Sequence, residues 1–196
     1  MLRAGARVGE TGTWKDMQLP EFPEIGTTVG YPDVVRPTIK RRRFHTWYSH
    51  MSSENLEALI RNAMNLSPRL WPYGVSPRGW CSPLVIHHGL AKKFARKRDR
   101  QHIYFVNYIR DALEYPTEVW LGRHRGKPRI RFFKKLSVAG DVHNLLVCAD
   151  PRDSLVVTAY DAPPHVCDAS REGTLLHVSW SIPAKRTGTG NPVPDC

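Results

Sequence analysis

The spacing of apolar residues in the first half of the chain predicts two amphipathic helices. Apolar residues recur every three or four positions after Ser52 and Ser53, either of which can cap a helix, until Pro68 ends the pattern. The same period returns over residues 99–113. We expect the apolar side of each predicted helix to face the core. These sides consist of Leu56, Leu59, Ile60, Ala63 and Met64 in the first helix and of Ile103, Val106, Ile109 and Leu113 in the second.

From residue 118 onwards the hydrophobic period becomes two, which is typical of β-strands. Turn-forming residues separate the alternating segments. The predicted strands cover residues 118–124, 129–136, 141–148, 154–160 and a possible fifth, 174–182, with turns at 125–128 and 150–153. This order predicts an α+β fold in which N-terminal helices precede a four- to five-stranded antiparallel sheet. The helices would pack on one face of the sheet and leave the other face free to bind a ligand.

Proline, glycine and aromatic residues indicate how the chain is divided. Residues 1–43 lack periodicity and end in a basic run, so we expect a poorly ordered or extended arm. Residues 44–90 should hold the first helix and an aromatic, proline-rich connector. Residues 91–184 form the predicted α+β domain, and 185–196 a tail.

The positive charge of the chain is concentrated in one block. The 196 residues carry 29 Lys and Arg against 18 Asp and Glu, a net charge of +11. Residues 86–135 alone hold 14 basic and 4 acidic side chains, a net +10. Such a cluster favours a polyanionic partner, nucleic acid before anionic lipid, although a solvated basic helix face has the same composition.

Several function classes lack their sequence signals. The chain has no phosphate-binding loop, dinucleotide-binding glycine motif, zinc protease motif or nucleophile elbow. The adjacent His87 and His88 lack a carboxylate at ligand spacing, so we expect no metal and no cofactor. The start of the chain lacks the apolar stretch of a secretory signal, and no apolar run approaches the roughly 18 residues of a membrane span. The four scattered cysteines fit reduced thiols, and we expect a cytoplasmic protein.

The remaining candidate residues suit phosphodiester chemistry. Cleavage of RNA by its own 2′-hydroxyl needs a proton acceptor, a proton donor and cations that stabilise the phosphorane. The candidates are His102 at a helix start, Arg123, Arg125, Arg129, Arg131 and Lys134 around the first hairpin, and Thr158 and Tyr160 on a later strand. Each of them also has an ordinary structural interpretation. Composition and spacing therefore leave a nuclease and a non-catalytic nucleic-acid-binding protein equally open.

The second half of the chain resembles a known group of toxins. The segments HIYFVNYIRDALEYPTEVW, RIRFFKKL, LLVC and LVVTAYDA are similar to the phage-associated toxin branch of the barnase, EndoU, colicin-D and RelE-like nuclease superfamily. This resemblance implies a helix followed by a four-stranded antiparallel sheet with an RNA-cleaving face. It implies a bacterial, metal-independent ribonuclease toxin carried by a mobile element, and an acidic immunity protein or antitoxin as a partner.

The resemblance also assigns residues. It places the helix-start histidine at His102, the P-x-E-V-W segment at residues 116–120, the basic strand at Arg129, Arg131 and Lys134, and the T-x-Y strand at Thr158 and Tyr160. We therefore predict an endoribonuclease that cleaves tRNA or mRNA through a 2′,3′-cyclic phosphate. The predicted catalytic residues are His102, Arg131, Lys134, Thr158 and Tyr160, and the predicted substrate-binding residues are Arg123, Arg125, Arg129 and Trp120.

Two alternatives remain beside this hypothesis. One is a non-catalytic nucleic-acid-binding protein of a phage or mobile element, in which the arm from Lys40 to Tyr48 extends the basic block. The other is ADP-ribosyl transfer, for which Glu118 is the only acid near a suitable place.

Overall fold

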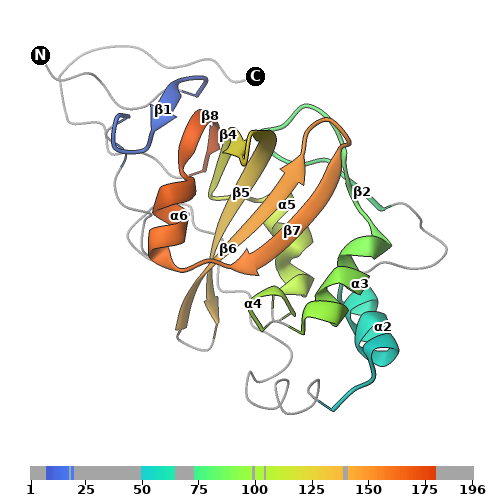
Figure 1. Ribbon diagram of the computed structural model, residues 1–196. Coiled ribbons are helices and arrows are strands. Elements are labelled where there is room, and N and C mark those ends of the chain that lie inside the picture. The colour runs from blue at the N-terminus through green and yellow to red at the C-terminus, as the bar shows by residue number, and fades with distance from the viewer. Residues whose placement is uncertain are drawn as a thin grey trace, which may run out of the picture.

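The computed structural model describes residues 8–17, 19, 50–64, 73–98, 100–103, 105–138 and 141–179. The helices are α2 (Ser53–Ala63), α3 (His88–Lys97), α4 (Arg100–Ile103), the 3-10 turn η1 (Val106–Tyr108), α5 (Ile109–Glu114) and α6 (Pro164–Ser170). The strands are β1 (Thr11–Thr13), β2 (Tyr73–Val75), β3 (Leu84–Ile86), β4 (Glu118–His124), β5 (Lys127–Val138), β6 (Asp141–Asp150), β7 (Leu155–Asp161) and β8 (Glu172–Val178). The α+β class is as predicted (Figure 1).

All the described strands form one sheet of eight, in the order β1-β8-β4-β5-β6-β7-β3-β2. The strands β4 to β7 are consecutive antiparallel neighbours, as the alternating sequence predicts. Among the described strands, only β3 runs parallel to a neighbour, β7, with Val85 opposite Leu155. The prediction of four to five strands was too low, because β1, β2 and β3 have three residues each and are too short to show a period of two.

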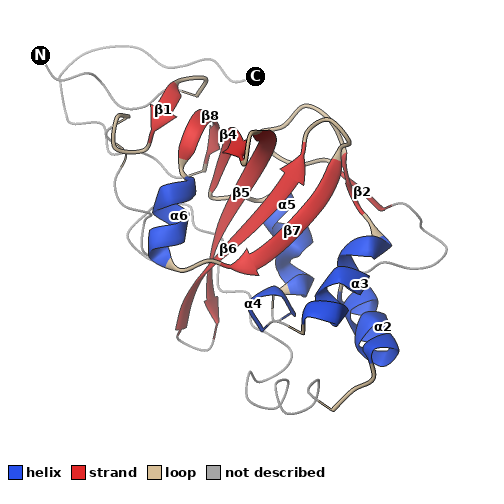
Figure 2. Cartoon of the chain, viewed as in Figure 1, coloured by secondary structure: helices blue, strands red, loops and turns tan. Residues whose placement is uncertain are grey.

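Helices cover both faces of the sheet, not one (Figure 2). On one face, α2, α3 and α5 bury a large apolar cluster against β5 and β6, which includes Phe94, Phe132 and Val147. On the other face, α6 and the side chains of Trp14, Met17 and Leu19 bury a smaller cluster that contains Trp120, Phe133 and Leu146. The second face is therefore closed over β8 and β4, and its open part lies over β5, β6 and β7.

A buried ion pair joins α6 to the sheet beneath it. Glu118 and Arg171 are both 0% exposed. Arg171 Nε and Nη2 donate to Glu118 Oε2 and Oε1, each at 2.8 Å. The Trp120 indole N–H donates to Glu118 Oε2 at 2.8 Å. The guanidinium of Arg171 also lies 5.0 Å from the centroid of the Trp14 ring. This pair fixes the covered half of the second face.

The two predicted helices had different outcomes. The first begins as predicted, since Ser52 accepts a hydrogen bond from the Asn55 N–H at 3.2 Å, but it ends at Ala63. The single helix predicted over 99–113 is wrong, because the chain forms α4, η1 and α5 in succession. Helix α3 was not predicted. Its exposed face is basic, and its end is set by Arg98 in the left-handed conformation, φ 50°.

The order of helices before strands was also wrong. Two short strands precede α3, and α6 lies between β7 and β8. Part of the predicted arm is structured: β1 pairs with β8, and Met17 and Leu19 are buried against the sheet. The basic run Lys40–Arg43, the aromatic residues after it and the predicted tail at 185–196 lie outside the described residues, as do residues 180–184. No described helix is long and apolar enough to cross a membrane.

Candidate active site

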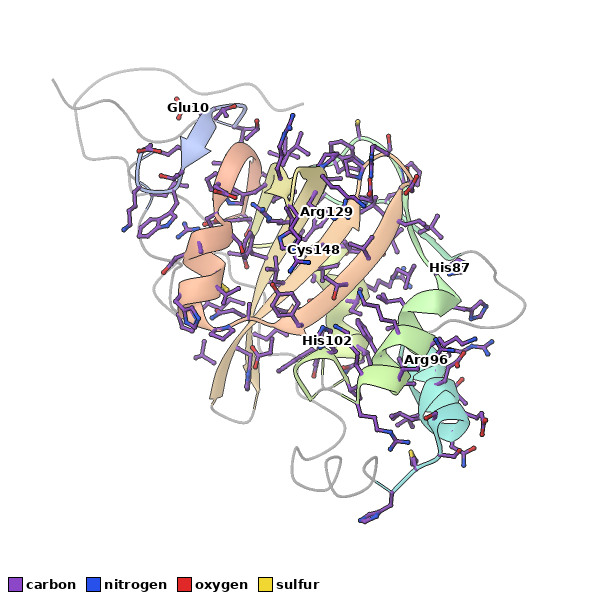
Figure 3. All side chains as sticks on the ribbon, viewed as in Figure 1. Glu10, His87, Arg96, His102, Arg129 and Cys148 are labelled. Atoms are coloured by element: carbon purple, nitrogen blue, oxygen red, sulfur yellow. The ribbon has the colours of Figure 1, made fainter. Side chains whose placement is uncertain are left out.

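Strand register gathers polar side chains on the open part of the second face. Arg131 lies opposite Cys148 on β6, and Cys148 lies opposite Thr158 on β7. Tyr160 follows two residues later, opposite Leu146, and so shares this face. Figure 3 shows Arg129 and Cys148 over the middle of the sheet, between α6 and α3. Thr158 and Tyr160, which the sequence placed on one strand face, therefore belong to the same surface as the arginines of β5.

His102 joins this surface from outside the sheet. It lies on α4, which packs beside β7, and its ring centroid is 5.7 Å from that of Tyr160. On its other side, the centroid of the Phe94 ring is 5.2 Å away. Both His102 and Tyr160 are half-buried. Two of the predicted catalytic residues, His102 and Tyr160, are thus in contact, although 58 positions separate them in the chain.

Burial keeps two groups on this face protonated. It raises the pKa of the Tyr160 hydroxyl to about 12 and that of the Cys148 thiol to about 11. Nearby Arg131 opposes the shift in both cases, because a cation favours the anionic form. Tyr160 therefore holds its proton throughout the neutral range and can act as a hydrogen-bond or proton donor.

Arg129 is held in place by a carboxylate. Its Nη1 donates to Asp150 Oδ2 at 2.7 Å and to the Pro128 carbonyl at 2.7 Å. Asp150 also accepts hydrogen bonds from the side chain and backbone N–H of Arg152. These hydrogen bonds, led by those of the Arg152 side chain, hold the pKa of Asp150 well below its usual range. Arg129 is therefore oriented with one terminal nitrogen occupied, and its guanidinium retains further donors.

Arg131, a predicted catalytic residue, is a buried structural link in this conformation. Its residue exposure is 5%. Nη1 donates to the Ser170 carbonyl at 2.9 Å, and Nη2 donates to the Arg123 carbonyl at 2.5 Å. The guanidinium fits over Gly122, where an added Cβ would lie 2.7 Å from Nη1. Nη1 also donates to the carbonyl of Glu172, the first residue of β8, at 3.4 Å. Arg131 thus fastens β4, the end of α6 and the start of β8 to β5.

Replacing Arg131 by glutamine should lower the free energy of unfolding by about 1–3 kcal/mol, since it leaves buried carbonyl oxygens without donors. Urea unfolding of the purified variant measures this. The matched control is Arg123→Gln, whose side chain is exposed and which contributes only its carbonyl to the link. If Arg131→Gln is as stable as the wild type but no longer cleaves RNA, the result would instead support a catalytic role for Arg131.

Lys134 lies on the opposite face of the sheet from Arg131 and does not reach the open face. Alternation along β5 turns it toward α5, where it is 2% exposed. Its Nζ donates to the Tyr115 carbonyl at 2.6 Å and lies 3.2 Å from Asp111 Oδ2. Burial lowers the pKa of Lys134, and Asp111 opposes this shift. Lys134 and Arg131 therefore lie on opposite faces of β5, and their positions do not support the prediction that both bind the same phosphate.

Trp120 and the hairpin arginines also divide between interior and surface. Trp120 is 0% exposed beneath α6, so a stacking role on substrate does not fit its position. Arg123 and Arg125 are exposed at the β4–β5 turn, where Arg125 has a φ of 51°. Glu118, which the transferase alternative requires, is buried with both carboxylate oxygens hydrogen-bonded to Arg171, and a catalytic role does not fit it.

The structure adds two side chains that the sequence analysis had not assigned to the site. Cys148 follows from strand alternation once β6 is in register with β7. Lys93 comes from α3, and its Nζ donates to the Val157 carbonyl at 2.8 Å. No local pattern links residue 93 to residue 157. Within the described part of the chain, no three His, Cys, Asp or Glu side chains are grouped as a metal site would require.

Comparison with known proteins gives one match. Residues 81–178, half of the chain, match the model of a family described as phage-Barnase-EndoU-ColicinE5/D-RelE like nuclease2. No curated protein and no solved structure matches. The matched residues contain β3 to β8, and hence all the side chains of the open face described above.

Proposed function

This chain belongs to the phage-Barnase-EndoU-ColicinE5/D-RelE like nuclease2 family, and from that premise we propose that it is a toxin-type, metal-independent endoribonuclease. The proposed substrate is RNA, either tRNA or mRNA. The 2′-hydroxyl of the RNA attacks the adjacent phosphate, and the product carries a 2′,3′-cyclic phosphate. The observation that carries the proposal is the contact of His102 with Tyr160 at the border of a sheet face that also presents Arg129.

The reaction needs two proton transfers. The 2′-oxygen attacks phosphorus and loses its proton to a base, while the bond from phosphorus to the 5′-oxygen breaks and that oxygen gains a proton. Histidine is the usual base near neutral pH, and we assign this role to His102. Tyr160, whose pKa of about 12 keeps it protonated, donates to the leaving oxygen. The proton gained by His102 then returns to solvent, and the Tyr160 phenolate takes up a proton from solvent. Both groups are restored, and the reaction consumes no other reactant.

Charge on the phosphorane is stabilised by the cationic groups of the same face. Arg129 is held by Asp150 through one nitrogen, so its orientation is set before substrate binds. Its remaining N–H groups can donate to the non-bridging oxygens, for which a guanidinium is well shaped. Thr158, half-buried on β7 two residues before Tyr160, offers a hydroxyl to the same phosphate.

A non-catalytic nucleic-acid-binding protein is the second candidate. The exposed Arg123, Arg125 and Lys127 of the β4–β5 hairpin favour it, because a basic hairpin binds a phosphate backbone without any acid–base pair. The same surface suits an acidic immunity protein or antitoxin as the partner of a toxin. Turnover separates the two candidates, since only the nuclease changes the RNA.

Incubation of the purified protein with total RNA in EDTA tests the proposal. We expect fragments whose 3′ ends carry a 2′,3′-cyclic phosphate, detected by mass spectrometry, and no cleavage of a 2′-O-methyl RNA of the same sequence. Intact RNA favours the binding protein. Cleavage that requires a divalent cation, or that also cuts the 2′-O-methyl RNA, refutes the mechanism.

A further inference from the structure

Lys93 is a cation placed at the edge of the candidate site by a contact across the fold. Its Nζ donates to the carbonyl of Val157, 64 residues away, at 2.8 Å. That carbonyl belongs to the peptide unit that leads into Thr158. An ammonium group has three N–H donors, so two remain after this hydrogen bond. The docked position brings a positive charge to the strand that carries Thr158 and Tyr160.

The surroundings of Lys93 indicate that its side chain reaches from α3 to the edge of the open face. Burial raises the pKa of Cys148, the residue between Arg131 and Thr158 in the strand register, and the Lys93 ammonium is one of the cations that oppose this shift. Partial burial lowers the pKa of Lys93, with Lys97 acting in the same direction. Two like charges one helical turn apart therefore stand on the same side of α3.

The basic residues of α3 fall into two pairs. Lys93 and Lys97 lie on the side that meets β7. Lys92 and Arg96, also four apart and exposed, belong to the outward side, and Figure 3 shows Arg96 on the side of α3 away from the sheet. No acidic residue occurs in α3. Favourable interaction with the helix dipole accounts for Arg96 and Lys97 in the last turn, but not for the docking of Lys93 on β7.

Lys93 and the proposed acid–base pair of His102 and Tyr160 lie along the same strand, β7. Lys93 contacts β7 at Val157, and His102 of the next helix contacts it at Tyr160. In the sequence, Lys97 lies between Lys93 and His102. The inner pair of α3 thus borders the site on the side opposite the β4–β5 hairpin, which α3 faces across β5, β6 and β7 (Figure 1).

We propose that Lys93 and Lys97 bind phosphates of the substrate RNA strand beside the scissile one, so that the strand crosses β5, β6 and β7 from the basic hairpin to α3. The inference rests on the proposed function and extends it, since it adds a second binding segment that the sequence analysis did not identify. Cations on both sides of the acid–base pair hold the scissile phosphate between two anchored flanks.

The test measures binding of a fluorescein-labelled, single-stranded 2′-O-methyl RNA, which cannot be cut by 2′-hydroxyl attack. Lys93→Gln with Lys97→Gln removes the inner charges while the new amide at 93 can still donate to Val157. Lys92→Gln with Arg96→Gln removes the same charge from the outward side. Fluorescence anisotropy at several salt concentrations gives the dissociation constant and its salt dependence, and thermal unfolding confirms that both variants are folded.

We expect the inner pair to weaken binding at every salt concentration and to reduce the slope of log affinity against log salt by about 0.7 for each lost phosphate contact. The outward pair should leave the slope close to that of the wild type. Equal effects of the two pairs, or no effect of the inner pair, overturn the proposed binding segment. If the wild type binds this probe but never cuts unmodified RNA, the proposed nuclease fails while the binding segment stands.

Discussion

Replacement of His102 by alanine should lower the rate of RNA cleavage by about 10²–10⁴-fold, the usual contribution of a general acid or base. The variant keeps Arg129, Thr158 and the basic hairpin, so its affinity for the 2′-O-methyl probe should be nearly unchanged. Single-turnover cleavage of unmodified RNA measures the rate, and fluorescence anisotropy measures the affinity. A loss in rate with retained binding is the result expected of a proton carrier.

The control for His102 is His165→Ala. His165 is exposed on α6, across the open face from α4, and should affect neither rate nor affinity. Tyr160→Phe provides an independent check, because it keeps the ring beside His102 and removes only the hydroxyl. Equal cleavage by His102→Ala and the wild type would remove His102 from the mechanism and would leave the contact with Tyr160 as packing.

Arg171→Met should lower the free energy of unfolding by about 3–5 kcal/mol, the cost of leaving a buried charge without its partner. Glu118 would keep only the Trp120 indole hydrogen bond in a site that is 0% exposed. Guanidinium denaturation measures the change. We expect the covered half of the second face to loosen, since α6 is tied to β4 through this pair.

Two variants show whether the pair is the cause. Glu118→Gln combined with Arg171→Met removes both charges and should recover part of the lost stability. Arg110→Met removes an arginine from the ion pair with Glu114, where the side chains are 48% and 28% exposed, and should cost at most about 1 kcal/mol. A cost for Arg171→Met no greater than for Arg110→Met contradicts the assignment.

The central strands β4 to β7 could be predicted from the sequence because apolar and polar residues alternate along them. The segment 118–124 has the predicted bounds, and β5 to β7 differ from theirs by one or two residues at most ends. The helices were harder. The basic side chains of α3 dominate its sequence, so the segment was interpreted as a charge cluster and not as a helix. Its apolar side consists of four residues, Leu90, Ala91, Phe94 and Ala95.

Part of the site could be predicted, and the register explains which part. Thr158 and Tyr160 share a face because side chains alternate along a strand. The same rule places Lys134 and Arg131 on different faces of β5. The prediction grouped Arg131 and Lys134 by charge and did not apply this alternation to Lys134. The burial of Arg131 could not be predicted, since its hydrogen-bond acceptors are carbonyls at Arg123, Ser170 and Glu172. Charge alone does not distinguish a phosphate ligand from a structural link.

The pairing of β1 with β8 has a consequence for how such an enzyme is made. Thr11 and Thr174 are hydrogen-bonded neighbours separated by 163 positions in the chain. A ribosome delivers β1 early and β8 late, and β8 is also the strand that pairs with β4. The sheet of the nascent chain therefore stays incomplete until β8, the last of the described strands, has been synthesised. A nuclease built in this way cannot close this side of its sheet before then.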